Sequence, residues 1–193
     1  GLLKPDVSKK IAAGIQHVIN AGDKEGGARP SRVIKYEPLL IKAAGMDATM
    51  LHVGRSSQDM HATYYSAIMR DNVLRLSSQL STTMELLNKL AKANEDTIVP
   101  NYTNGVAAQP NSYAHYLQGL LAGFKRDSKR LQEFYVRLNL CPMGTTVLNG
   151  TSWPLNRDKM AHYLGFAGLV EDAYDASQIK PVDEPIELSA ILT

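Results

Sequence analysis

The sequence has a single cysteine and no long hydrophobic run. Cys141 has no second cysteine with which to form an internal disulfide, which excludes a disulfide scaffold and favours a reducing compartment. Every apolar stretch is far shorter than the ~20 residues that cross a bilayer. We therefore expect a cytoplasmic protein without a membrane partner.

An excess of charge of one sign is lacking too. The 21 Lys and Arg residues are nearly matched by 19 Asp and Glu residues, so the formal net charge is only +2. A chain this close to neutral offers no electrostatic case for nucleic acid as its main partner. Hydrophobic residues make up 44% and charged residues 21% of the chain, which excludes a disordered tail and favours a packed globular chain.

Patterns that would indicate a bound cofactor or metal are absent from the sequence. The glycines of residues 22–27 are not followed by the Lys-Ser/Thr pair of a phosphate-binding loop. The five histidines are scattered and never spaced as His-x-x-x-His. Cys141 has no neighbouring base, so we expect a small buried side chain. We predict neither a metal nor an organic cofactor.

What the sequence does contain is helical periodicity. Residues 58–94 include no Gly or Pro, which predicts one helix about 55 Å long. Its apolar side chains recur as in a heptad seam, at Val73, Leu76, Leu80, Met84, Leu87 and Ala91. A second long helix is predicted over residues 111–138, with a stripe at Tyr113, Leu117, Leu120, Phe124, Leu131, Phe134 and Leu138. Helices of this length must pack along one another, as in a bundle.

The remaining segments predict short helices and loops. Short helices are predicted over residues 7–20, 37–44, 157–164 and 174–180, and residues 21–30 and 97–110 are interpreted as loop and turn regions. We see no β alternation and predict an all-α fold, with an N-terminal helical region (1–56) and a long-helix bundle (57–193). A last helix, opening at Ile186, reaches the end of the chain without a stop signal, and no Met opens the sequence, so we expect a piece of a longer protein.

A polar segment accompanies each long helix. Arg55, Ser56, Ser57 and Gln58 lie at the start of the first, where unpaired backbone N–H groups favour anions, and the planar Arg55 guanidinium suits a carboxylate. Thr103 and Asn104 lie between the two helices. Taken singly, the serines are better explained as helix caps and residues 103–104 as turn residues.

Three segments together resemble a known family. Leu51-His-Val-Gly-Arg-Ser-Ser-Gln-Asp59 resembles the signature His-Thr-Gly-Arg-Ser-Arg-Asn-Asp of argininosuccinate lyases, in the fumarase/aspartase superfamily. Pro100-Asn-Tyr-Thr-Asn-Gly-Val-Ala-Ala-Gln-Pro110 resembles their second signature, Pro-Gly-Tyr-Thr-His-Leu-Gln-x-Ala-Gln-Pro. Residues 142–157 are similar to the family's Pro-Leu-Gly-x-Gly-Ala-Leu-Ala-Gly-Thr-x-x-Pro-x-x-Arg. We call these the first, second and third motifs; their order and spacing agree with the family's.

The resemblance implies a fold and an activity. Members of this family are homotetramers built around a bundle of long helices, with active sites shared between subunits. They act on small dicarboxylates by β-elimination, in which C–N or C–O cleavage of a substituted succinate releases fumarate without metal or cofactor. The family's mobile-loop signature, Gly-Ser-Ser-x-Met-Pro-x-Lys-x-Asn, is absent from this sequence, so we expect the chain alone to be inactive.

The resemblance also implies residue roles. The substrate-binding set is Arg55, Ser56, Ser57, Gln58 and Gln109, and the catalytic pair is Thr103 and Asn104. Ser56 and Gln58 would hold a substrate carboxylate and Thr103 would donate to it, whereas Arg55 and Asp59 would organise the loop.

Three positions depart from the argininosuccinate lyase pattern. Ser57 stands where that pattern has Arg, Gln58 where it has Asn, and Asn104 where it has His. An amide cannot relay a proton near neutral pH as an imidazole does. We therefore expect a fumarate-releasing lyase with an altered substrate. The alternative is a catalytically inactive structural or regulatory relative, since some family members serve as lens structural proteins.

Overall fold

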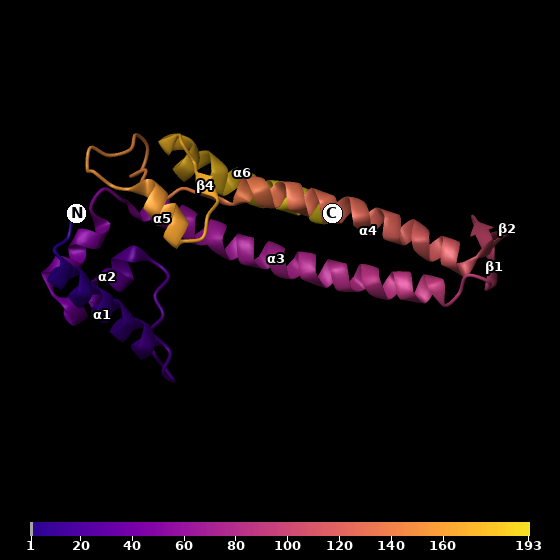
Figure 1. The fold of residues 1–193 in the computed structure, drawn as a ribbon, viewed down its shortest axis with the longest axis horizontal. Helices are drawn as coiled ribbons and strands as arrows, with labels where there is room; N and C mark the ends of the chain where they lie inside the picture. The colour runs from indigo at the N-terminus through magenta and orange to yellow at the C-terminus, as the bar shows by residue number, and fades with distance from the viewer. Residues whose placement is uncertain (1) are drawn as a thin grey trace. The chain divides into compact units, whose positions relative to one another are not determined.

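The computed structural model describes residues 2–193, most of which lie in helices (Figure 1). The helices are α1 (Pro5–Gly22), α2 (Val33–Ala44), the 3-10 helix η1 (Met46–His52), α3 (Ser57–Lys92), α4 (Tyr113–Leu138), α5 (Arg157–Tyr163), the π-helical turn η2 (Asp175–Ile179) and α6 (Lys180–Leu192). The strands are β1 (Ile98–Thr103), β2 (Val106–Ser112), β3 (Leu140–Cys141) and β4 (Gly168–Leu169). The fold is thus mainly helical, as predicted.

The chain forms two compact units. The first contains residues 2–65 and 140–182, and the second contains residues 66–139 and 183–193. Each unit is built from segments that are distant in the sequence, and α3 and α6 contribute residues to both. The predicted division at residue 57 into a helical region and a bundle stays a prediction.

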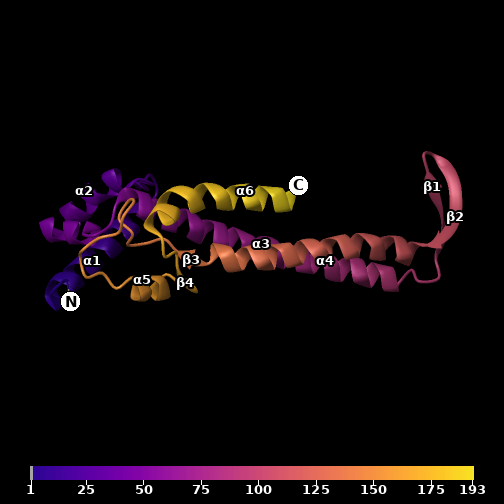
Figure 2. The same ribbon diagram turned by 90° about the horizontal axis from the view of Figure 1, so that it is seen from above.

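The second unit is a pair of long antiparallel helices. From residue 66 onward, α3 runs beside α4, and the two are joined at one end by the β1–β2 hairpin (Figure 2). Val73 of the predicted seam packs with Leu131, Phe134 and Leu138, and Leu188 and Ile191 of α6 cover this cluster. A second cluster, nearer the hairpin, consists of Ala91, Ala114 and Leu117. The predicted long helices and their heptad seam are confirmed.

One position of the predicted α4 stripe is wrong. Leu120 is 46% exposed, whereas its neighbour Leu121 is 3% exposed and belongs to the core. The 3.6-residue period does not select Leu121, because Leu120 and Leu121 lie three and four residues after the buried Leu117 and both spacings keep a side chain on one helical face. The sequence offers two adjacent leucines there, and only packing distinguishes them.

The prediction of a fold without β strands is also wrong. β1 and β2 pair antiparallel, from Ile98 opposite Ser112 to Thr103 opposite Val106, with an irregularity between Pro100 and Tyr102. Prolines in both strands hide the alternation, because proline cannot donate to the ladder and argues against a strand. β3 and β4 pair in parallel over two residues each, which is too short to leave a pattern.

The first unit packs α1, α2 and η1 around a small core. Leu40, Ala44 and Ala48 form the buried cluster, with Ile15 and Val18 of α1 against it. A Cβ added at Gly14 would meet the Cβ of Ala44 at 2.7 Å, so glycine lets the two helices approach closely. The helices predicted over 7–20, 37–44 and 157–164 are confirmed, although α2 begins earlier, at Val33.

The C-terminal helices differ from the prediction. The sequence predicts separate helices over 174–180 and from Ile186. Instead η2 continues directly into α6, which runs through Pro185 to Leu192. Cys141 in β3 is fully buried, as expected, and its carbonyl accepts the Val170 N–H at 3.0 Å. Within residues 2–193, no helix is long and apolar enough to cross a membrane.

Candidate functional site

The first motif begins helix α3 with a reciprocal cap. The Ser56 hydroxyl accepts the backbone N–H of Gln58 at 3.1 Å, and the Ser56 N–H donates to Oδ1 of Asp59 at 2.7 Å. This is the capping-box arrangement, with Asp in place of the usual Glu, and it fixes the entering chain against the first helical turn. The loop that carries Arg55 and Ser56 is therefore held by its own helix.

Asp59 also connects the first motif to the third. Its side chain is fully buried, and its Oδ2 accepts the backbone N–H groups of Gly144 at 2.8 Å and Thr145 at 3.1 Å. One carboxylate thus accepts three backbone N–H groups from segments about 85 residues apart. Such a charge-assisted network is strong, and it makes the position of the loop depend on both motifs.

The third motif is a turn held by side chains of both motifs. Gly144 has φ +85°, and a Cβ there would lie 2.7 Å from Met160 Cε and 3.1 Å from Arg157 Cγ. The Thr146 hydroxyl donates to the Gly54 carbonyl at 3.0 Å. Arg157 donates from Nε to the Met143 carbonyl at 3.1 Å, and also to the carbonyl of residue 170. These contacts make the third motif a support for the first.

The side chains of the first motif divide between two environments. Those of Ser57 and Gln58 are exposed and Ser56 is half-buried, all at the N-terminal turn of a 36-residue helix. A helix N-terminus favours negative charge, and hydroxyl and amide groups can donate to a carboxylate. Ser56, Ser57 and Gln58 thus present hydroxyl and amide groups at the N-terminus of α3.

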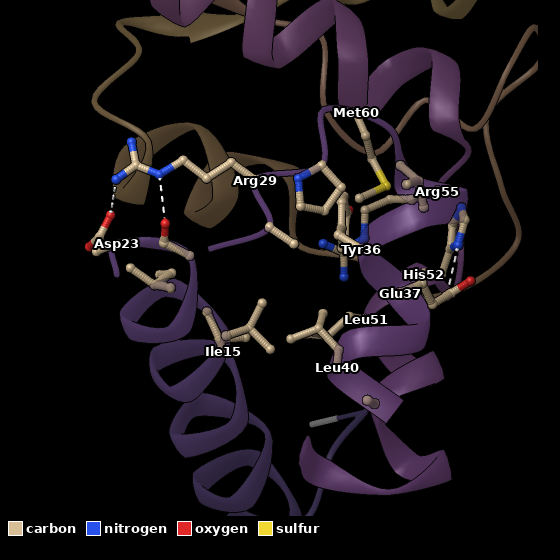
Figure 3. A pocket seen from close by; sticks show the side chains of 17 residues that line it. Ile15, Asp23, Arg29, Tyr36, Glu37, Leu40, Leu51, His52, Arg55 and Met60 are labelled. Carbon is tan, nitrogen blue, oxygen red and sulfur yellow. Dashed lines mark hydrogen bonds and ion pairs between the residues drawn. The ribbon is translucent and has the colours of Figure 1, made fainter. Parts of the chain in front are cut away.

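Arg55 instead lines a pocket of about 560 Å³ in the first unit (Figure 3). The Arg55 Nε is buried and has no hydrogen-bond partner among residues 2–193. Burial lowers the pKa of Arg55, and the nearby charges of Asp59 and Tyr36 oppose that shift. Burial also raises the pKa of Tyr36, with a further contribution from Glu37, while Arg55 opposes it.

The second motif forms the β1–β2 hairpin of the second unit. Thr103 pairs with Val106, and between them Asn104 has φ +48° and Gly105 has φ +78°. Positive φ at both central residues defines a type I′ turn, for which Asn-Gly is the strongest sequence preference. Thr103, Asn104 and Gln109 are all exposed. Asn104 is thus explained by the turn geometry alone, whatever further role it has.

The structure places the predicted site residues in two groups. Arg55, Ser56, Ser57 and Gln58 adjoin one another in the first unit, whereas Thr103, Asn104 and Gln109 lie on the hairpin of the second unit. Neither unit contains both groups. Within residues 2–193, no group of three or more His, Cys, Asp or Glu side chains is arranged to hold a metal ion.

Sequence reasoning missed two features of these segments. The partners of Asp59 in the third motif are the backbone N–H groups of Gly144 and Thr145. Residue type does not indicate which backbone N–H will donate to a distant side chain. Tyr36 beside Arg55 was not singled out either, because the two lie 19 positions apart without a shared pattern. The Asn104-Gly105 dipeptide was a usable hairpin signal that the prolines obscured.

Comparison with known proteins gives consistent relatives. A family model described as lyase matches residues 12–193. The argininosuccinate lyase of Ruminiclostridium cellulolyticum is 31% identical over 199 residues, which cover 100% of this chain and 42% of that protein. The argininosuccinate lyase of Acetivibrio thermocellus is 38% identical over 160 residues, which cover 83% of this chain and 34% of that protein. The chain thus spans less than half the length of these curated relatives.

Solved structures agree with the sequence relatives. EDDS lyase in complex with formate superposes with a TM-score of 0.91 at 31% identity, covering 100% of this chain and 39% of that one. A variant of EDDS lyase with bound fumarate gives the same values. The 3-carboxy-cis,cis-muconate lactonizing enzyme of Pseudomonas putida, at 22% identity and a TM-score of 0.67, shares the fold.

Proposed function

This chain belongs to the lyase family, as an argininosuccinate lyase-like member of the fumarase/aspartase superfamily, and we propose that it carries the carboxylate-binding segment of an enzyme that releases fumarate. The observation that carries the proposal is the Asp59 network, which holds Ser56, Ser57 and Gln58 in one place at the start of α3. A preorganised set of donors is what a developing anion requires.

The proposed reaction is a β-elimination from a substituted succinate. A base removes the proton from the carbon next to one carboxylate, and the bond from the neighbouring carbon to nitrogen or oxygen breaks. The electron pair leaves with the amine or oxygen, which takes up a proton, and a carbon–carbon double bond forms to give fumarate. Negative charge accumulates on the carboxylate in the transition state, so donors around that group lower the barrier.

We assign the donors to the two groups of residues. Ser56 and Gln58 hold the substrate carboxylate, with Ser57 beside them, while Thr103 donates to the developing anion and Gln109 supports the substrate. Asn104 orients a carboxylate or amine through its amide. The hydrogen bonds of Asp59 support an organising role for that residue.

We further propose that the enzyme is a homotetramer with shared active sites. Long helices of the second unit expose apolar side chains, which favours burial against other copies. These are Leu74, Leu86, Leu90, Tyr116, Leu120 and Val136. A shared site would combine the Ser56–Gln58 group of one subunit with the hairpin group of another. A cytoplasmic location fits the single thiol of Cys141.

The substrate is proposed to differ from argininosuccinate. Ser57 offers no cation where argininosuccinate lyases have Arg, and Gln58 is one methylene longer than Asn. Loss of one charged anchor changes which substituents fit beside the carboxylate. Another N- or O-substituted succinate is therefore the expected substrate.

Two reactions of the full-length protein test the function. Fumarate is mixed with a panel of amines and amino acids and its consumption is followed, while argininosuccinate cleavage is assayed in parallel. We expect fumarate consumption with at least one amine and no argininosuccinate cleavage. Cleavage of argininosuccinate would contradict the altered substrate, and no turnover by the folded assembly would favour the inactive structural relative, which Asn104 in place of His motivates.

A pair of variants tests the role of the hairpin. Thr103→Val removes the proposed donor, and we expect kcat/KM to fall about a hundred-fold or more, the usual effect of losing one donor to a developing anion. Thr82→Val removes an exposed hydroxyl on α3 that donates to the Ser78 carbonyl and serves as the matched control. Equal activity of the two variants would contradict the assignment of Thr103.

A further inference from the structure

The pocket beside Arg55 is mainly apolar, whereas the segment Ser56–Gln58 that follows Arg55 in the sequence is polar. Helices α1, α2 and η1, the loop after α1 and the start of α3 line this open pocket, and most of its wall is hydrocarbon (Figure 3). The apolar part is formed by Ile15, Val18, Val33, Leu40, Leu51 and Met60. Its volume of about 560 Å³ is within the range of small-molecule sites.

The two carboxylates on the pocket wall each have a side-chain partner. Arg29 pairs with Asp23 at 2.7 Å and also donates from Nε to the Gly22 carbonyl at 2.8 Å. His52 lies 3.2 Å from Glu37. Both carboxylates of the wall therefore have a partner of their own, as Figure 3 shows.

Arg55 differs from these pairs. No carboxylate lies within ion-pair distance of its guanidinium among residues 2–193, and its Nε is buried without an acceptor. Asp59 acts on it at longer range, while the carboxylate oxygens of Asp59 accept backbone N–H groups. A partly buried guanidinium without a carboxylate partner is costly, and an anion in the pocket that pairs with its terminal nitrogens lowers that cost.

We propose that this pocket binds a small monocarboxylate with an apolar body, such as a straight-chain or arylalkyl acid of about six to ten carbon atoms. The ligand carboxylate accepts hydrogen bonds from the Arg55 guanidinium, beside Tyr36 and Met60. The hydrocarbon lies against Ile15 and Leu40, which face each other across the pocket in Figure 3.

The wall also explains which ligands are rejected. A dicarboxylate such as fumarate would bring its second charge against hydrocarbon, where an unpaired charge is costly. An alkylamine would place a cation beside the Arg55 guanidinium and be repelled. This site is therefore separate from the proposed substrate site, and the proposal goes beyond the proposed function.

The binding experiment uses hexanoate as the probe, with hexan-1-ol, hexylamine and fumarate as comparisons, and isothermal titration calorimetry of the protein as the measurement. We expect hexanoate to bind at least about ten-fold more tightly than hexan-1-ol, because a charged hydrogen bond replaces a neutral one. Hexylamine and fumarate should bind more weakly than hexan-1-ol. Equal affinity for the acid and the alcohol, or tight fumarate binding, would overturn the proposal.

Variants of two arginines on the same wall identify the anion partner. Arg55→Met keeps an unbranched stem and removes the charge, and hexanoate affinity should fall about ten- to a hundred-fold while hexan-1-ol binding stays within about three-fold. Arg29→Met is the matched control and should change hexanoate affinity by less than about three-fold, since Arg29 already pairs with Asp23. The reverse pattern would overturn the assignment to Arg55.

Two further measurements do not depend on the folding of the Arg55 variant. In the unaltered protein, hexanoate but not hexan-1-ol should shift the NMR signal of the Arg55 Nε–H. Ile15→Phe fills the apolar end of the pocket and should weaken both hexanoate and hexan-1-ol binding. An unmoved Arg55 signal at saturating hexanoate, or unchanged binding in Ile15→Phe, would place the ligand elsewhere and refute the proposal.

Discussion

The start of α3 and the tip of the β1–β2 hairpin carry the two groups of candidate site residues and are built in opposite ways. At the start of α3, the buried Asp59 accepts three backbone N–H groups, two of them from the third motif. At the hairpin tip, Asn104 and Gly105 are exposed, and a Cβ added at Gly105 would have nothing within 4 Å.

The difference concerns what fixes each segment. The loop of the first motif is fixed by long-range contacts, so its geometry exists only when the unit is folded. The hairpin tip is fixed by the φ preferences of two residues, so its geometry is local. A ligand that binds at the start of α3 loses little conformational entropy in ordering that loop. Side chains at the hairpin tip become ordered only when they contact a ligand or another chain.

The largest test of this comparison is removal of the Asp59 carboxylate. Asp59→Ala leaves three backbone N–H groups without their acceptor, two of them in the third motif, and should lower the free energy of unfolding by about 3–5 kcal/mol. Urea denaturation measures the change. Asp6→Ala removes an exposed carboxylate from the first turn of α1 and is the matched control, with an expected loss within about 0.5 kcal/mol. Equal losses would refute the network as the source of order.

The next test crowds the first motif. Gly54 has φ +65°, and an added Cβ would lie 2.7 Å from Leu155 Cδ1 and 3.2 Å from Thr151 Cγ2. Gly54→Ala should therefore cost about 2–3 kcal/mol from overpacking and strain. Gly150 has a similar φ of +75°, but an added Cβ would have nothing within 4 Å. Gly150→Ala should therefore cost only about 1 kcal/mol, from backbone strain alone. Denaturation curves of the two variants should differ; coincident curves would show that crowding is absent.

A smaller effect is expected at the hairpin tip. Gly105→Ala should destabilise the turn by about 1 kcal/mol, because φ +78° disfavours a Cβ even where space is open. Hydrogen exchange of the Val106 amide should become about five-fold faster. Gly119→Ala, within α4 and without close neighbours, should have the opposite sign and stabilise by about 0.5–1 kcal/mol. A large loss of global stability in Gly105→Ala would contradict the local character of the turn.

The smallest effect concerns pH and the two tyrosines, one in the pocket and one on the hairpin. Burial raises the pKa of Tyr36 above 10.0, so the unfolded chain loses this proton before the folded protein does. The resulting stability is present below pH 10 and is lost as pH rises through the folded-state pKa. Tyr36→Phe should flatten the fall in unfolding free energy above pH 10, and Tyr102→Phe is the exposed control. An unchanged slope in Tyr36→Phe would contradict the shift.

The elements that the sequence predicted best are those whose cause is local. Residues 58–94 lack Gly and Pro, so α3 followed directly, and its seam at Val73 and Ala91 is buried. The hairpin was missed because Pro100 and Pro110 argue against strands, although Asn104-Gly105 specifies the turn. At Leu120 and Leu121 two equally apolar neighbours compete, and only Leu121 is buried in the folded protein.

The candidate site was predictable only as far as it depends on motifs. The resemblance located Ser56, Gln58 and Thr103, but the Asp59 network needed coordinates, because its partners are backbone groups distant in the sequence. The pocket beside Arg55 arises from four helical segments that share no motif. Residue types predict chemistry, whereas three-dimensional packing decides where that chemistry is available.

The buried thiol of Cys141 can report how often the first unit opens. Cys141 is the single cysteine, fully buried in β3 beside the turn that begins with Pro142. A thiol reagent can reach it only when that strand opens, so the rate of labelling reports the opening of the first unit at one known atom. Measuring the labelling rate at increasing urea concentration distinguishes a local opening, whose rate is insensitive to urea, from unfolding of the whole unit. The experiment needs no engineered cysteine.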